Sequence, residues 1–249
     1  MIESFLWAWL STIVLSLCAW IHYLIFRINS IIDVFWSLGI LLAGLLISAS
    51  HLDLCSQLIK TMTILWSLRL ATFLYFTRVI TKKSDHRYDE ISSYWKNSKA
   101  YGYFWNFQLQ ALLMVSLTAP FFFLGTITIT PYFWTMYCLM GLAILGESLS
   151  DFYLYKHMQS KSKDLCLKGP WKYSRHPNYF FDWMFWLCFA GMALPYSYGW
   201  LALSSPLILF GIMNILTIPI SERNSIARRK DTYLKYQKST STFIPWFKK

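Results

Sequence analysis

Seven long apolar stretches constrain the fold of this chain more than any other feature of its sequence. A bilayer core needs about 20 apolar residues per helix. Seven windows satisfy that length: 4–26, 31–50, 58–80, 104–125, 131–155, 178–197 and 199–220. With 56% hydrophobic, 19% aromatic and only 14% charged residues, the chain is too apolar for an ordinary soluble domain. We therefore predict an all-α polytopic membrane protein with seven transmembrane helices.

The basic residues indicate the orientation of these helices. Of the 23 lysines and arginines, Arg27 follows the first window, five lie in 81–103, six in 156–176 and eight after residue 220. A seven-helix topology places all 20 of these residues on one side. Cytoplasmic loops collect Lys and Arg, so we predict the N-terminus outside and the C-terminus in the cytoplasm.

The formal charge of +11 could suggest a nucleic-acid partner, but the placement of the basic residues on one side of the predicted helices argues against it. The five cysteines are scattered without C-x-x-C spacing, so we expect neither a disulfide framework nor a metal site. The N-terminus carries Glu3 and no basic residue before its apolar run, unlike a cleaved signal peptide. The first window is therefore expected to remain as a helix.

Polar residues interrupt the apolar windows at a common depth. Charged groups inside a membrane are costly unless they face a cavity or a partner, and residues four apart share one helix face. Although the helices alternate in direction, these residues all fall in the predicted cytoplasmic half, so we predict one polar chamber open to the cytoplasm. They are Asp33, Tyr75, Asn106, Gln110, Glu147, Asp151, Asn178 and Asp182.

Two of these windows leave alternatives open. Asp33 could instead bond the free backbone N–H groups of its own helix terminus. Arg69, near the middle of the third window, should pair with a buried carboxylate or with a ligand. Pairing with Arg69 or Arg78 would satisfy one of the carboxylates of the fifth window, and the second carboxylate then indicates a polar ligand or a water cavity.

A basic loop, Gly169–Asp182, leads into the sixth window. A helix that begins at Pro177 would present free N–H groups and the positive end of its dipole beside Arg175 and His176, which favours a bound phosphate. Asn178 would then share one helix face with Asp182 at the end of the loop. The alternative is a basic anchor for anionic lipids.

The chain after residue 220 is basic and amphipathic, and we expect it to lie along the lipid headgroups. Its alternatives are an anionic-lipid anchor and a set of phosphate contacts beneath the chamber.

Several motifs together resemble the steroid 5α-reductase-like membrane reductases, closest to their bacterial branch. The most specific are the Gly169–Tyr179 loop, Tyr233-x-x-Tyr236 and the terminal Phe243–Phe247 segment. Further matches are Asp33-x-x-Trp36, Ser84–Tyr88, Asn106-x-x-x-Gln110 and Glu147-x-x-x-Asp151. The resemblance covers almost the whole chain from the second window onward.

The resemblance implies one membrane-embedded reductase domain over residues 1–249. Residues 1–103 would supply the substrate and catalytic helices, and residues 104–249 the cofactor-binding helices, the basic loop and the C-terminal tail. It implies NADPH-dependent reduction of an activated C=C bond in a lipid-like enone, such as a 3-oxo-Δ4-steroid, that enters from the bilayer. We expect a monomer in a bacterial inner membrane, with membrane lipids around it and the cofactor site facing the cytoplasm.

Site residues follow from the matching motif positions. Asp33 occupies the place of the family's catalytic Glu, and Tyr75 is matched to its catalytic Tyr, which would donate a hydrogen bond to the enone carbonyl. Trp36 and Arg69 are assigned to substrate. The cofactor residues would be Asn106, Gln110, Glu147, Asp151, Lys156, Trp171, Arg175, His176, Asn178, Tyr179, Asp182, Glu222, Arg228, Tyr233 and Tyr236.

The chain departs from the family pattern at Phe181 and Asp182, where Gly and Glu are usual. The bulky Phe181 could crowd the cofactor. One alternative function is an S-adenosylmethionine-dependent membrane methyltransferase, because such enzymes share an Arg-His-Pro-x-Tyr loop. Asn178 within that loop, and the many basic residues available for a 2′-phosphate, favour the reductase. A second alternative is a non-catalytic sterol- or lipid-binding membrane protein.

Overall fold

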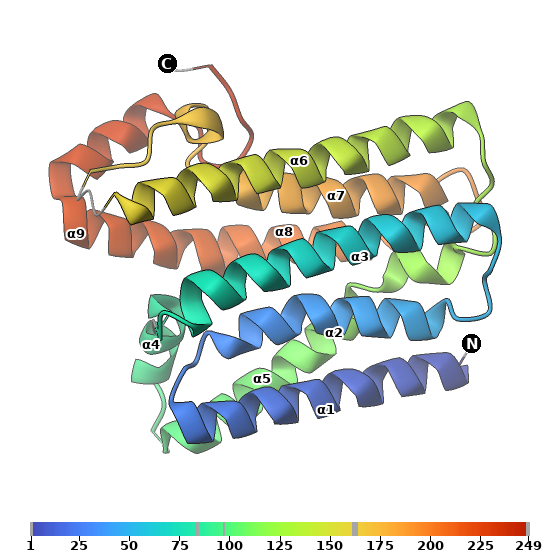
Figure 1. Ribbon diagram of the computed structural model, residues 1–249, viewed down its shortest axis with the longest axis horizontal. Helices are drawn as coiled ribbons and strands as arrows, with labels where there is room; N and C mark the ends of the chain where they lie inside the picture. The colour runs from blue at the N-terminus through green and yellow to red at the C-terminus, as the bar shows by residue number, and fades with distance from the viewer. Residues whose placement is uncertain (1, 83–84, 97, 161–163, 248–249) are drawn as a thin grey trace.

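The computed structural model describes residues 2–82, 85–96, 98–160 and 164–247, and regular structure in these ranges is helical (Figure 1). Ser84, part of one family motif, lies outside them. With η for short 3₁₀- or π-helical segments, the order is α1 (Ile2–Phe26), α2 (Ile31–Ile47), α3 (Leu54–Leu74), η1 (Tyr75–Val79), α4 (His86–Ser93), α5 (Lys99–Ser116), η2 (Ala119–Phe123), α6 (Pro131–Gln159), η3 (Gly169–Lys172), α7 (Pro177–Ala193), η4 (Gly199–Leu203), α8 (Ser204–Gly211), η5 (Ile212–Thr217) and α9 (Ile218–Ser239).

Helix occupies most of each of the seven apolar windows, so the all-helical class predicted from the sequence is confirmed for the described residues. Four helical runs among them are long and apolar enough to cross a membrane: Ile2–Phe26, Lys99–Phe123, Pro131–Gln159 and Gly199–Ser239. The α2 helix is apolar but shorter. These features are compatible with a membrane protein, while seven spans and their orientation stay a prediction.

Local signals explain where α6 and α7, which each carry two of the predicted polar residues four positions apart, begin. Thr130 precedes α6, and its hydroxyl accepts a hydrogen bond from the Phe133 N–H at 3.1 Å, with Pro131 in the first turn. Pro177 is the first residue of α7, as the sequence predicted. The two helices then pack along each other more extensively than any other pair of described elements.

The long helices lie side by side (Figure 1). α1, α2 and α3 follow one another across the molecule, α5 packs on α1 and α2, and α6 pairs with α7 on the other side. The short α4 and the C-terminal part of α9 lie at one end of the bundle. At that end α2, α5 and α7 begin, and α3 and α6 finish, so polar residues near those helix termini can meet.

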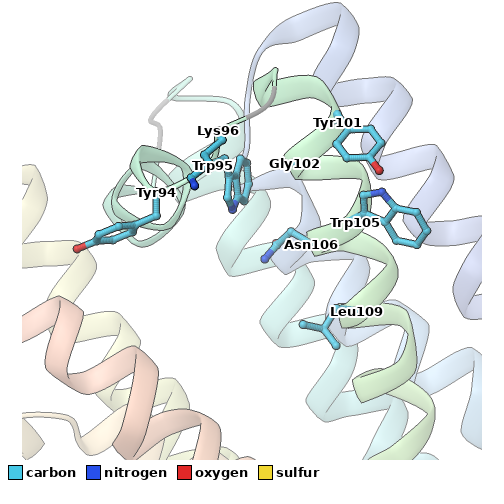
Figure 2. Close-up of a pocket in the computed structure, with 8 residues that line it drawn as sticks. All are labelled: Tyr94, Trp95, Lys96, Tyr101, Gly102, Trp105, Asn106 and Leu109. Atoms are coloured by element: carbon cyan, nitrogen blue, oxygen red, sulfur yellow. The ribbon is translucent and has the colours of Figure 1, made fainter.

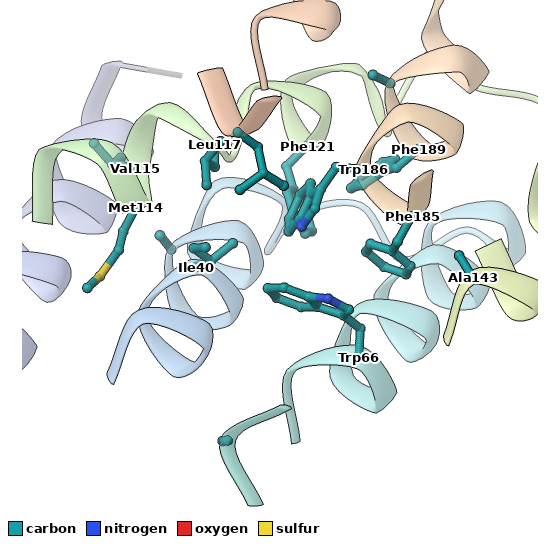
Figure 3. Packing of buried hydrophobic residues seen from close by; sticks show 14 of the residues in the cluster. Ile40, Trp66, Met114, Val115, Leu117, Phe121, Ala143, Phe185, Trp186 and Phe189 are labelled. Carbon is teal, nitrogen blue, oxygen red and sulfur yellow. The ribbon is translucent and has the colours of Figure 1, made fainter. Parts of the chain in front are cut away.

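Aromatic side chains fill the core away from that end (Figure 3). Trp66 of α3 stacks on Phe185 of α7 at 5.6 Å between ring centroids and meets Trp186 edge-on at 5.1 Å. Phe121 of η2 packs edge-on against Phe189 at 4.9 Å. All five rings are almost fully buried. Such offset and edge-on contacts add to the burial of large rings, and they fix α3 and α7 relative to each other.

Candidate functional site

A chamber with a volume of about 250 Å³ lies between the helices. Its polar wall comes from α2, η1, α4, α5, α6 and α7, whereas α3, α8 and η5 give it mainly apolar side chains. Nine residues predicted to form the site line it: Asp33, Trp36, Asn106, Gln110, Glu147, Asp151, Asn178, Tyr179 and Asp182. The structure thus brings these polar side chains from separate helices to one cavity.

Arg69 of α3 sits behind this wall and joins two carboxylates of α6. Its guanidinium forms ion pairs with Glu147 and with Asp151, the latter at 2.7 Å between Nη1 and Oδ2. Asp182 of α7 is a third carboxylate nearby, and its Oδ1 accepts a hydrogen bond from Trp66 Nε1 at 2.9 Å. One guanidinium therefore lies near three carboxyl groups, so this end of the chamber has more acidic than basic side chains.

Three buried oxygens at this end have no hydrogen-bond partner among the described residues: Glu147 Oε2, Asp151 Oδ1 and Asn178 Oδ1. A buried polar atom left without a partner costs about 1–3 kcal/mol, so native proteins satisfy nearly all of them. All three belong to residues that line the chamber. The chamber can therefore accept hydrogen bonds from the N–H and O–H groups of a ligand, although Arg69 Nε behind its wall also lacks a hydrogen-bond partner among the described residues.

A second polar cluster forms where α2 begins. Asp33 Oδ1 accepts a hydrogen bond from the Tyr88 hydroxyl at 2.6 Å, and Oδ2 accepts one from Arg87 Nη2 at 2.5 Å. Oδ2 also pairs with Arg78, and both arginines contact Asp85. Side chains, and not the backbone N–H groups of its own helix, therefore bind Asp33. Two carboxylates balance two guanidiniums here.

The electrostatics of this cluster follow from burial and charge. Burial alone would raise the pKa of Asp85, but the charges of Arg87 and Arg78 outweigh burial and hold the pKa well below its usual range. Burial and the neighbouring Asp33 carboxylate raise the pKa of Tyr88 well above its usual value. Tyr88 therefore keeps its proton at neutral pH and remains a hydrogen-bond donor.

The α5 helix extends the cluster around Asp33. Gln110 Nε2 donates to Asn106 Oδ1 at 2.9 Å, as their four-residue spacing predicts, and lies 3.4 Å from the Tyr88 hydroxyl. Tyr88, Arg78 and Arg87 are lining residues that sequence reasoning did not assign to the site. The signal that could have found Arg87 and Tyr88 is the Asp85–Tyr88 segment, which places Arg and Tyr soon after the third apolar window.

Tyr75, predicted as the catalytic tyrosine, does not lie at the chamber. Its side chain is 44% exposed on η1 and contacts Phe76 edge-on at 5.7 Å between ring centroids. Tyr88 is the tyrosine that hydrogen-bonds Asp33.

Arg175, predicted to bind phosphate, instead ties the C-terminal segment to α9. All five N–H donors of its guanidinium are used: the group bonds the Glu222 carboxylate, the backbone oxygens of Gln237 and Thr240, and the Thr242 hydroxyl. We call these five residues the clasp. A guanidinium with no free donor and 8% exposure leaves no N–H for a phosphate.

Six other predicted residues from the loops and the tail do not line the chamber: Lys156, Trp171, His176, Arg228, Tyr233 and Tyr236. His176 and Tyr233 contact Glu222, and the Tyr236 hydroxyl donates to the backbone oxygen of Trp171 at 2.5 Å. Burial lowers the pKa of His176, although Glu222 opposes that shift. Trp171 Nε1 donates to the Ser150 backbone, and Lys156 and Arg228 are exposed side chains.

Phe181 does not crowd the chamber. Its ring packs onto Gly146 of α6, where an added Cβ would lie 2.5 Å from ring carbons. The missing side chain at Gly146 therefore makes the room that Phe181 needs, and the ring fixes the α6–α7 contact. Among the described residues, no group of three or more His, Cys, Asp and Glu side chains could hold a metal ion.

Comparison with known proteins gives one match. Residues 19–240 match the family described as "Protein of unknown function (DUF1295)". The chain belongs to this family. The family is associated with steroid 5α-reductase-like proteins, in agreement with the resemblance seen in the motifs. No curated protein and no solved structure matches the chain.

Proposed function

We propose that this protein is an NADPH-dependent membrane reductase that reduces an activated C=C bond in a lipid-like enone, such as a 3-oxo-Δ4-steroid. The observation that carries the proposal is the set of unpartnered oxygens on Glu147, Asp151 and Asn178. The carboxamide of a nicotinamide and the hydroxyls of its ribose are N–H and O–H donors that would satisfy them. Both clusters lie on one cavity, so substrate and cofactor could meet there.

The bound cofactor would supply a hydride, and the protein's own residues would orient the substrate and stabilise charge. The enone oxygen would accept a hydrogen bond from the Tyr88 hydroxyl, in competition with Asp33, while negative charge develops on that oxygen. Arg78 and Arg87 would keep Asp33 neutralised when it loses its bond to Tyr88. Gln110 would help to orient the Tyr88 side chain, because its Nε2 donates a hydrogen bond to the Tyr88 hydroxyl. We assign Tyr88, in place of Tyr75, to this role.

The proposal includes seven spans, formed by α1, α2, α3, α5, α6, α7 and the run from η4 to the start of α9. The N-terminus would lie outside, and the C-terminus and the open end of the chamber would face the cytoplasm of a bacterial inner membrane. The support is the basic loops and tail, which follow the positive-inside rule. Short helices such as α2 and α7 would span if they ran close to the bilayer normal or thinned the bilayer locally.

One observation favours a second candidate, an S-adenosylmethionine-dependent methyltransferase. The acidic excess around Arg69 would suit the positive sulfonium of that donor. The reductase remains preferred because the unpartnered oxygens suit the amide and hydroxyl donors of a nicotinamide riboside, and the Asp33–Tyr88 pair suits a carbonyl substrate.

A binding comparison tests the proposal. The purified protein in detergent would be titrated with NADPH and with S-adenosylmethionine while its thermal unfolding is followed. A ligand that binds only the folded state increases the free energy of unfolding, by about 2.7 kcal/mol at a ligand concentration of a hundred times Kd. The unfolding temperature rises accordingly. We expect NADPH alone to stabilise the protein. Stabilisation by S-adenosylmethionine alone would replace the reductase with the methyltransferase, and stabilisation by neither would refute both.

A further inference from the structure

The two sides of α5 differ in how they are covered. On one side α5 packs against α1, where Trp20 Nε1 donates to the Ala100 backbone at 2.9 Å and the rings of Tyr23 and Tyr103 lie 4.2 Å apart. On the other side, α5 lines the chamber together with α8 and η5, and neither of these helices packs extensively along α5 in the described chain. Between α5 and η5, the chamber is therefore not closed by extensive direct packing of the two helices.

Two further hollows adjoin the chamber at this wall. The first is lined by aromatic residues of the α4–α5 region and shares Asn106 and Leu109 with the chamber (Figure 2). The second lies between α4 and η5 and shares Leu216 and Ile220 with the chamber. The chamber therefore shares lining residues with one hollow on α5 and with the other hollow on η5, and the two hollows lie on either side of the gap between these helices.

The gap is apolar and faces outward. Leu109 of α5 is 56% exposed and Leu216 of η5 is 47% exposed, yet both also line the chamber. η5 is π-helical, a geometry that is frequent at functional sites. At the proposed depth in the membrane, exposed leucines contact lipid chains. An apolar molecule dissolved in the bilayer could thus reach the chamber by this gap without crossing water.

The size of the chamber limits what it can enclose. Its volume of about 250 Å³ is below the roughly 300–1,000 Å³ of pockets that bury a drug-sized ligand. The charged groups of the chamber lie toward α2, η1, α4, α6 and α7, and its apolar wall is formed by η5 and by Leu109 and Leu113 of α5. The chamber therefore suits the polar head of an amphiphile, while the apolar remainder of the molecule stays outside.

We propose that the gap between α5 and η5, with Leu109 and Leu216 on its two sides, is a lateral portal. Through it an amphipathic lipid places its carbonyl-bearing head in the chamber and leaves its apolar tail in the bilayer. This inference rests on the proposed function and adds the route and the class of substrate. The head meets the polar chamber, and the tail occupies the gap beside the aromatic hollow of Tyr94, Trp95 and Trp105.

The test measures access to the chamber and uses no cofactor. In a variant whose five native cysteines are replaced, Met213→Cys places one thiol on the chamber wall, where Met213 is 5% exposed. The protein in phospholipid vesicles is treated with butyl, octyl and hexadecyl maleimide and with a charged, water-soluble maleimide. Thiol addition to the maleimide double bond is followed by mass spectrometry. We expect labelling by all three alkyl reagents, because the tail remains outside.

Closing the portal should slow this labelling. Leu109→Trp with Leu216→Trp should lower the rate with hexadecyl maleimide by about tenfold or more. The matched controls Leu112→Trp on α5 and Leu207→Trp on α8 are also exposed but do not line the chamber, and they should leave the rate unchanged. Size-exclusion elution and thermal unfolding check the fold of each variant, and Leu109→Trp alone replaces the double variant if that one misfolds.

Equal labelling of the open and narrowed variants would overturn the portal. So would rejection of the hexadecyl reagent, or labelling by the water-soluble reagent alone. Failure of the proposed function is separate, because it would show as a lack of NADPH binding by a protein whose Met213→Cys thiol is still reached from the bilayer.

Discussion

Two of the arginine–carboxylate clusters among the described residues, the clasp and the one around Arg69, differ in how completely their hydrogen-bonding groups are satisfied. In the clasp, all five donors of Arg175 have partners. In the chamber, Arg69 pairs with Glu147 and Asp151, yet each carboxylate retains an oxygen without a partner. A fully bonded buried network stabilises one conformation, whereas a partly bonded one on a cavity wall is available to a ligand.

Residues of the same motif can therefore have either a structural or a binding role. Arg175 and Asn178 are three residues apart in the same motif, and the resemblance assigned both to the cofactor. The structure directs Arg175 toward the C-terminal segment and Asn178 toward the chamber. The change occurs where α7 begins at Pro177. Substitutions on the two sides of that helix start should therefore affect different properties.

The largest expected effect is on the clasp. Arg175→Ala would leave the Glu222 carboxylate buried without its cation, and breaking a buried pair costs about 3–5 kcal/mol. Arg175→Lys should also destabilise the protein, because one ammonium cannot replace five N–H donors. Thermal unfolding in detergent measures both. Arg228→Ala, on the exposed surface of α9, is the control. If Arg175→Ala unfolds like the unchanged protein but loses NADPH binding, the clasp is a binding site after all.

The next effect is on turnover. Tyr88→Phe removes the proposed donor to the enone oxygen and should lower kcat by about 10²-fold, the lower end of acid–base contributions, with NADPH affinity unchanged. Tyr75→Phe is the matched control, because that side chain lies outside the chamber. NADPH oxidation with an enone is the measurement. The reverse result, a loss in Tyr75→Phe alone, would restore the assignment made from the sequence.

A smaller effect is expected for the cofactor. Asn178→Ala removes one of the unpartnered oxygens and should weaken NADPH binding by about tenfold, corresponding to a lost hydrogen bond of ~1.4 kcal/mol. Its unfolding temperature without ligand should fall less than that of Arg175→Ala, because Oδ1 bonds nothing in the protein and only the hydrogen bond of Asn178 with Asp151 is lost. Calorimetric titration gives the affinity. Unchanged affinity together with a large loss of stability would make Asn178 a structural residue like Arg175.

The smallest effect is a pH dependence of the clasp region. Burial lowers the pKa of His176 in the folded protein, while Glu222 opposes and Arg175 reinforces the shift. Below about pH 6.5 the unfolded chain binds a proton more readily than the folded one. Stability should therefore be complete above that pH and decline as the pH falls below it. His176→Gln should show a weaker decline in unfolding temperature between neutral and mildly acidic pH, and an identical decline would exclude His176 as its source.

The sequence predicted the helices and the polar chamber because both depend on local patterns. Apolar windows of membrane length gave the helical class, and the four-residue spacing of Asn106 with Gln110 put both on one face, where they are hydrogen-bonded. Which groups pair with each charged side chain depends on how different helices pack together. The spacing of residues along the sequence does not determine that packing. Hence the sequence assigned Arg175 to phosphate and Tyr75 to the catalytic position, and it did not indicate the contact of Tyr88 with Asp33. The compensation of Phe181 by Gly146 is likewise a contact between two helices.

A structure of the protein with NADPH tests most directly the central claim that the unpartnered chamber oxygens bind the cofactor. We predict that the nicotinamide carboxamide and ribose hydroxyls lie within hydrogen-bond distance of Glu147, Asp151 and Asn178, while Arg175 keeps all its protein partners. A cofactor bound through Arg175 outside the chamber, or chamber oxygens that contact only ordered water beside a bound cofactor, would contradict the claim.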